Sequence, residues 1–140
     1  HAACSGVSAA IDFISSLGQG STYREKLESA YLQISDHEFN LAKHLYESLE
    51  DFDKTTVIGP DFSTRKRTPT VSFVHSEYSP QEVCALLAKQ NICAWDGHFY
   101  ALKAIQQLGL ESRGGVTRLG ISLYNTRKEI DKVIEVIKSI

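Results

Sequence analysis

Apolar side chains recur at helical spacing over the first third of the chain. The first such run covers residues 3–17 and stops at Gly18 and Gly20, which predicts one helix. The second covers residues 23–52, and a helix of about 30 residues is about 45 Å long. A capping-box pattern at Ser35–Glu38 lies inside this run, so we expect a kink or restart there, or packing of part of the helix on something outside the chain.

From residue 55 onward, short β-type runs alternate with helical patterns. The expected strands cover residues 55–58, 70–75 and 92–95, and the expected helices begin at Ser79, His98 and Thr126. Short strands with short connections favour an α+β fold, in which a small antiparallel or mixed sheet has helices on one face. We therefore expect a single domain over residues 1–140, with a helical segment over 1–54 and the sheet with its helices over 55–140.

A further strand pattern over residues 116–123 presents one arginine opposite its apolar face. The apolar face comprises Thr117, Leu119, Ile121 and Leu123. Arg118 lies on the other face beside Gly120, and a glycine inside a strand often marks the close approach of a ligand or another backbone. No predicted helix is left to cover this face. Arg118 is therefore either an ordinary surface arginine or a planar cation that binds a carboxylate or phosphate through two hydrogen bonds.

Composition narrows the class of protein. The chain has 140 residues, which fits one domain, and a net charge of -2, which argues against a nucleic-acid partner. The basic triplet Arg65-Lys66-Arg67 is expected to be solvated loop. No apolar run approaches the roughly 18 residues of a membrane span, and three widely spaced cysteines indicate reduced thiols and a cytoplasmic protein. Because there is no methionine, we expect the chain to be processed or cut from a longer one.

Metal and nucleophilic chemistry find little support in the sequence. No HExxH or CxxC spacing, nucleophile elbow or phosphate-binding glycine loop occurs, and Cys84 and Cys93 are expected to be structural. The segment Trp95–Tyr100, with a turn expected at Asp96-Gly97, is either a loop that orients a small polar ligand or a plain surface turn. It would lie near Arg118 if the strand over residues 92–95 pairs with the strand over residues 116–123.

Three segments, in order along the chain, resemble the class V aminotransferases, the pyridoxal-phosphate (PLP) proteins that include cysteine desulfurases and selenocysteine lyases. They are Arg67–Phe73, Trp95–Ala101 and Arg118–Asp131, and they look like the cysteine desulfurase-like subfamily. The opening His1–Gly6, followed by an alanine-rich helix, is similar to the point where such chains leave their large domain. The resemblance extends over essentially the whole chain and implies the small C-terminal domain of a fold-type-I PLP enzyme.

The resemblance also implies roles for particular residues. Arg118 matches the arginine that holds the α-carboxylate of the amino-acid substrate, and His98 and Tyr100 would line the same cavity. Gly97–Tyr100 matches the segment in which desulfurases carry Gly-His-His-Cys, whose cysteine accepts sulfur. Tyr100 stands in the place of that cysteine. Since a phenol cannot form a persulfide, desulfurase activity by that route is not implied.

The cofactor implied by the resemblance belongs to the large domain, where it is bound as a Schiff base to a lysine. No lysine of this chain has the desolvated surroundings of such a site. We therefore expect a missing N-terminal PLP-binding domain, a homodimer when full length, and neither covalent PLP nor turnover in this chain alone. No metal site and no catalytic residue are expected here. The alternative is a free-standing α+β module whose Arg118 face binds a small anion or a protein without catalysis.

Overall fold

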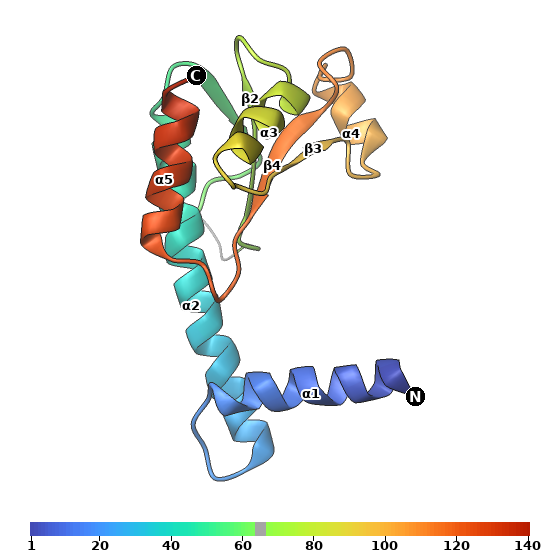
Figure 1. Cartoon of the computed structure of the whole chain (residues 1–140), viewed down its shortest axis with the longest axis vertical. Coiled ribbons are helices and arrows are strands. Elements are labelled where there is room, and N and C mark those ends of the chain that lie inside the picture. Colours follow the sequence, from blue (N-terminus) through green and yellow to red (C-terminus); the bar gives the residue numbers. More distant parts are fainter. Residues whose placement is uncertain (64–66) are drawn as a thin grey trace. The chain divides into compact units, whose positions relative to one another are not determined.

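The structure is a computed structural model that describes residues 1–63 and 67–140 (Figure 1). In chain order the elements are α1 (Ala2–Ser16), α2 (Tyr23–Glu50), β1 (Thr55–Ile58), β2 (Thr70–His75), α3 (Pro80–Lys89), β3 (Trp95–Gly97), α4 (Leu102–Gln107), β4 (Val116–Gly120) and α5 (Arg127–Lys138). Of the predicted basic triplet, Arg65 and Lys66 lie outside the described residues.

Contacts divide the chain into two compact units, His1–Glu38 and Phe39–Ile140. The boundary lies within α2, whereas the sequence pattern placed the end of the helical segment at residue 54. The single domain over residues 1–140 stays a prediction, and the two units are described separately.

The first unit is a helical hairpin formed by α1 and the first part of α2. Its turn depends on Gly18, because a Cβ at this position would lie 1.8 Å from the carbonyl oxygen of Lys26. The Tyr23 hydroxyl donates a hydrogen bond of 2.7 Å to Asp12 Oδ1 across the same turn. Only glycine leaves room for the chain to reverse this closely against the α2 backbone.

The kink expected at Ser35–Glu38 is wrong, because α2 is helical without interruption from Tyr23 to Glu50. The apolar positions Ile34, Leu41 and Leu45 keep their helical register on both sides of the polar segment. A cap at Ser35 would replace backbone hydrogen bonds that a continuous helix already makes, so nothing favours a break.

The second unit holds a four-stranded antiparallel sheet in the order β1-β2-β4-β3, which confirms the predicted α+β fold. Burial alternates along β2, where Val71, Phe73 and His75 are buried and the residues between them are half-exposed. In β4 the same alternation leaves Thr117 and Leu119 buried and Arg118 half-exposed. One face of the sheet therefore belongs to the core and the other does not.

Helices α2, α3 and α5 supply most of the rest of this core. The apolar cluster joins the buried sheet residues Val71, Phe73 and Leu119 to helical side chains. From the helices it includes Leu41, Ala42, Leu45, Tyr46, Leu49, Val83, Leu87, Ile130, Val133, Ile134 and Ile137. The prediction of helices on one face of the sheet is confirmed.

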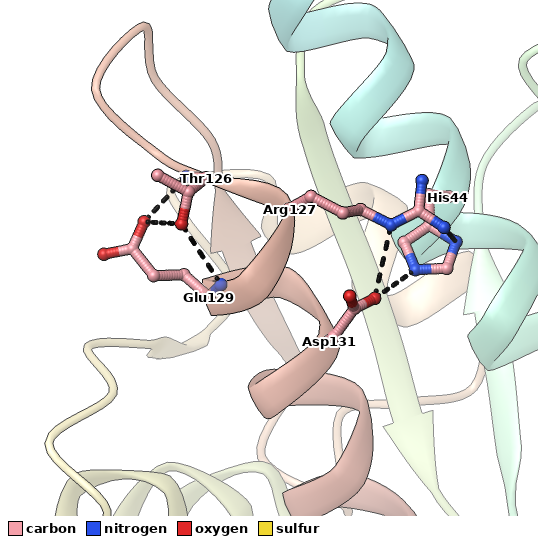
Figure 2. A network of polar contacts seen from close by, with 5 residues as sticks. All are labelled: His44, Thr126, Arg127, Glu129 and Asp131. Carbon is pink, nitrogen blue, oxygen red and sulfur yellow. Dashed lines mark hydrogen bonds and ion pairs between the residues drawn. The ribbon is translucent and has the colours of Figure 1, made fainter.

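The helices expected to begin at Ser79 and Thr126 each start with a capping box. At the start of α3 the Ser79 hydroxyl accepts from the Glu82 N–H while the Glu82 carboxylate accepts from the Ser79 N–H, and Thr126 and Glu129 repeat the arrangement at α5 (Figure 2). The hydrogen bonds from Ser79 lower the pKa of Glu82, since they stabilise the charged carboxylate. Each box satisfies backbone groups that the first helical turn leaves without partners.

A polar network fixes α5 on the second half of α2. His44 Nε2 lies 2.7 Å from Asp131 Oδ1, and the Arg127 guanidinium lies 3.0 Å from His44 Nδ1 and 3.3 Å from the same Asp131 oxygen (Figure 2). Because arginine only donates, His44 Nδ1 accepts and Nε2 carries the proton donated to Asp131. The hydrogen bond from His44, followed by the contacts from Arg127, lowers the pKa of Asp131.

Several predicted boundaries differ from the observed ones near the later strands. The third strand covers Trp95–Gly97 instead of 92–95, so the turn predicted at Asp96-Gly97 is wrong. The next helix begins at Leu102 instead of His98, because Phe99 and Tyr100 have φ values of 49° and 61° that no α-helix accommodates. The fourth strand ends at Gly120, and the Asn125 side chain accepts from the Ser122 N–H in the turn that follows.

His75 is a buried ionisable group on the core face of β2. It is 1% exposed and lies between the rings of Phe52 and Tyr78, at centroid distances of 6.3 and 5.2 Å. Its Nδ1 accepts from the Glu77 N–H at 3.2 Å, and its Nε2 has no partner among the described residues. Burial, followed by the nearby positive charge of Lys54, lowers the pKa of His75, so the folded state favours the neutral ring.

We predict that His75 makes stability fall on acidification. Its folded-state pKa lies below its unfolded value of about 6.5, so the unfolded chain binds more protons between the two values. Stability is therefore lost as the pH falls from about 6.5 through the lowered folded pKa. In urea unfolding, His75→Gln should flatten this dependence, while His1→Gln at an exposed position should not. Equal slopes for His75→Gln and the parent chain would contradict the prediction.

Candidate functional site

Arg118 lies at the centre of the sheet face that points away from the core. In the antiparallel register it is opposite Ser72 of β2 on one side and Trp95 of β3 on the other. Directly opposed residues point to the same face of a sheet, so these three side chains share a surface. The expected pairing of the Trp95 strand with the Arg118 strand is confirmed, with β3 over Trp95–Gly97.

An aromatic ring covers one side of the Arg118 guanidinium. Arg118 Cζ lies 3.9 Å from the centroid of the Phe99 ring, which is a cation–π contact. The Trp95 ring in turn lies edge-on to Phe99, with centroids 6.5 Å apart and an interplanar angle of 76°. Arg118 is therefore held within an aromatic surface formed by the β3 strand and the turn that follows it.

That turn runs from His98 to Ala101 and has an unusual backbone. The Ala101 N–H donates to the His98 carbonyl at 2.7 Å, and both central residues, Phe99 and Tyr100, have positive φ. Positive φ at both positions is typical of a type I′ turn, which glycine and asparagine adopt most easily. A left-handed conformation costs about 1–2 kcal/mol at a residue that carries a Cβ.

The structure places the other two predicted site residues on the outer side of the turn. His98 is exposed and its Nδ1 accepts from the Tyr100 N–H at 3.2 Å. Tyr100 is 100% exposed, and its ring lies 6.4 Å from the His98 ring. The ring that contacts Arg118 is that of Phe99, a residue that sequence reasoning did not select. The sequence feature that could have pointed to Phe99 is the run of three ring-bearing residues, His98, Phe99 and Tyr100, directly after Gly97.

Arg118 differs from the other described arginines in what its N–H groups do. Arg24 and Arg127 each pair with a carboxylate, of Glu28 and Asp131 respectively. Arg67 and Arg113 donate to backbone carbonyls, Arg67 to those of Pro60 and Thr70 and Arg113 to those of His75, Ser76 and Tyr78. Within residues 1–63 and 67–140, the Arg118 guanidinium has no hydrogen-bond or ion-pair partner. Its donors are available to a ligand.

A cavity of about 440 Å³ adjoins the end of β4. Leu119 and Ile121 of the β4 region and Ile130 of α5 form apolar parts of its wall, and Gly120, two residues from Arg118, also lines it. Cys93 is exposed at this cavity, whereas burial raises the pKa of the Cys84 thiol to about 11. Cys84 is therefore protonated at neutral pH and unreactive, as expected for a structural cysteine.

Metal binding has no support in the described part of the chain, where no group of three or more histidine, cysteine, aspartate or glutamate residues could hold an ion. None of the described helices is both long and apolar enough to cross a bilayer.

Comparison with known proteins identifies the family. The sequence pattern of the family described as "Aminotransferase class-V" matches residues 4–133. The chain belongs to this family. Among its relatives are a probable cysteine desulfurase of Mycobacterium leprae, which is 29% identical over 89% of this chain, and an aminotransferase-like protein of Gibberella zeae, which is 31% identical over 84% of it.

Solved structures agree with this family assignment. A cysteine desulfurase from Thermococcus onnurineus, solved without ligand, matches 84% of this chain with a TM-score of 0.73 and 26% identity, and the match covers 28% of that structure. A cysteine desulfurase from Escherichia coli shares the fold, with a TM-score of 0.65 over 87% of this chain and 31% of its own. The chain thus spans under a third of these proteins, and 19% and 30% of the M. leprae and G. zeae relatives.

The pairing that brings Phe99 to Arg118 depends on Gly115, the residue before β4. A Cβ at Gly115 would lie 2.3 Å from the Gly97 carbonyl oxygen, and its φ of +99° is unfavourable for any other residue. We predict that Gly115→Ala lowers the free energy of unfolding by about 2–4 kcal/mol, because both the backbone contact and the φ must be relieved.

The matched control for this prediction is Gly120→Ala, at the other end of β4. A Cβ there meets nothing within 4 Å, and no unfavourable φ is present. Urea unfolding should show a change of no more than about 1 kcal/mol for this variant. If both variants lost the same stability, the close approach of Gly115 and Gly97 would not be what holds β3 on β4.

Proposed function

We propose that this chain is the C-terminal domain of a PLP-dependent, cysteine desulfurase-like enzyme that acts on an amino acid, and that Arg118 binds the α-carboxylate of that substrate. Family membership and the relatives' names support the enzyme class. That the chain covers only 19–30% of those relatives supports a further, PLP-binding part of the protein.

One observation carries the role of Arg118: its guanidinium is stacked on a ring while its N–H groups have no partner among the described residues. A guanidinium presents its donors in a planar fork that matches the two oxygens of a carboxylate. An arginine with a structural role donates to acceptors of its own chain, as Arg113 does to the His75 carbonyl and Arg127 does to the Asp131 carboxylate. An open fork on the uncovered face of a sheet is suited to binding an anion.

The described lysines do not fit a PLP attachment site. Lys43 and Lys54 are half-buried and lie 3.7 and 2.9 Å from the carboxylates of Glu47 and Glu77. The remaining described lysines are exposed, whereas a Schiff-base lysine is commonly desolvated so that its amine loses its proton. We assign the cofactor to the rest of the protein.

Tyr100 narrows the reaction that we propose. At its position a thiol would accept sulfur, and a phenol cannot form the corresponding persulfide. We therefore assign to the enzyme an amino-acid reaction without sulfur transfer to this turn. His98 and Tyr100, both exposed beside the Arg118 surface, are proposed to line the substrate cavity once the rest of the protein covers them. A homodimer and a cytoplasmic location are proposals of the same kind.

The role of Arg118 is tested by two ligands that differ only in the carboxylate. In the PLP-loaded full-length protein, the dissociation constants of L-alanine and ethylamine are measured from the absorbance of the cofactor. We predict that Arg118→Ala weakens L-alanine binding by about 100-fold, the loss expected for charge-assisted hydrogen bonds, and leaves ethylamine binding unchanged.

The control for a general effect of removing an arginine is Arg24→Ala, because Arg24 is exposed and, among the described residues, pairs with Glu28 on its own helix. This variant should bind both ligands as the parent protein does. Equal weakening of L-alanine and ethylamine by Arg118→Ala, or no change in either, would remove Arg118 from the carboxylate site.

The assignment of the cofactor is tested on the 140-residue chain. After incubation with PLP and reduction with borohydride, we predict label spread over several exposed lysines with no saturation, because none of the described lysines is desolvated. Stoichiometric label on one lysine, found by mass spectrometry, would contradict this prediction.

A further inference from the structure

We propose that Phe99 is a positioning residue, which holds the Arg118 guanidinium in the orientation needed to bind a carboxylate. This inference rests on the proposed function of Arg118.

The contact orients Arg118 without using its hydrogen-bond donors. Arg118 Cζ lies 3.9 Å from the Phe99 centroid, close enough for the ring to attract the cation through its face. The N–H bonds of a guanidinium lie in its plane, so a ring above that plane leaves them free. Arg113 illustrates the alternative, since the carbonyls of His75, Ser76 and Tyr78 hold it by accepting from its Nη2.

Phe99 is itself held by its surroundings. Trp95, directly opposite Arg118 across the β3–β4 pair, places its ring edge-on to Phe99 at 6.5 Å. The hydrogen bond from the Ala101 N–H to the His98 carbonyl closes the turn around Phe99. Phe99 is half-buried, and the neighbouring Tyr100 is 100% exposed, so the turn directs one ring onto Arg118 and the next one away from it.

The turn alone does not account for a phenylalanine at this position. With φ at 49°, glycine or asparagine would adopt the same backbone at lower cost. A strained backbone persists where the surrounding structure over-determines it, and such positions gather at binding sites. The contact with Arg118 is the gain that offsets the strain.

The stack is tested first without any activity, by NMR of the 140-residue chain. Protons of Arg118 above the Phe99 ring should resonate upfield of those of Arg24, which is exposed and pairs with Glu28, and Phe99→Leu should remove this displacement. Phe99→Tyr, which keeps the ring, should retain it, and Phe99→Gly should lose it although glycine favours the turn. An Arg118 spectrum that is the same in Phe99→Leu and the parent chain would overturn the inference.

The positioning role is tested in the PLP-loaded full-length protein with the L-alanine and ethylamine pair. Phe99→Leu should weaken L-alanine binding about three- to tenfold, the range expected for a cation–π contact, with ethylamine unchanged. Phe99→Tyr should restore the affinity for L-alanine, which a merely structural defect in the turn would not explain.

The outcomes separate this inference from the proposed function. If Arg118→Ala weakens L-alanine selectively and Phe99→Leu does not, Arg118 binds the carboxylate without help from Phe99, and only the inference is wrong. If neither variant affects L-alanine, both are wrong. If Phe99→Leu weakens L-alanine and ethylamine equally, Phe99 supports the turn as a whole and is not a positioning residue for Arg118.

Discussion

The sheet of the second unit depends on β4, an inner strand that pairs with β2 on one edge and with β3 on the other. Its core-facing residues Thr117 and Leu119 are 0% and 5% exposed, and they pack in the layer to which α2, α3 and α5 contribute. Because side chains alternate along a strand, burying this pair turns Arg118 to the opposite face, and a slip of one residue would place the cation in the core. The packing of Thr117 and Leu119 in the core therefore fixes the register of β4 and, with it, the face on which Arg118 lies. Arg118 itself takes no part in that packing.

The core does not determine which groups surround the Arg118 guanidinium. The backbone conformation of nearby residues does. Gly115 allows the chain to approach Gly97 closely enough for the short β3 strand to pair with β4. The left-handed turn after β3 then lays Phe99 on Arg118. Phe99 and Arg118, which are 19 positions apart in the sequence, are thus brought together by two features of the backbone. One is the glycine at position 115, and the other is the unfavourable φ at position 99. The aromatic contact is the result of both.

The sequence predicts the fold where side-chain periodicity and capping act locally. The capping boxes at Ser79 and Thr126, the alternation along β2 and the direction of Arg118 all follow from such patterns and are confirmed. The predictions fail where backbone conformation or a distant contact decides. Nothing in the residue types of Phe99 and Tyr100 signals positive φ, so the helix was expected to begin at His98, and the β3 boundary depends on a glycine about 20 residues away. The contact between Phe99 and Arg118 needs both of these features and could not be read from spacing.

The same turn explains how the residue type at position 100 is free to vary. Tyr100 is 100% exposed and contributes nothing to the apolar cluster, while Phe99 beside it is half-buried against Arg118. A thiol and a phenol at position 100 are therefore equivalent for the packing of this unit and differ only in what they do to a ligand. Position 99 lacks that freedom if its ring orients the guanidinium. Two adjacent residues of one turn are thus under different constraints. The residue at position 99 is constrained by its contact with the Arg118 guanidinium, and the residue at position 100 is constrained only by the chemistry of a ligand.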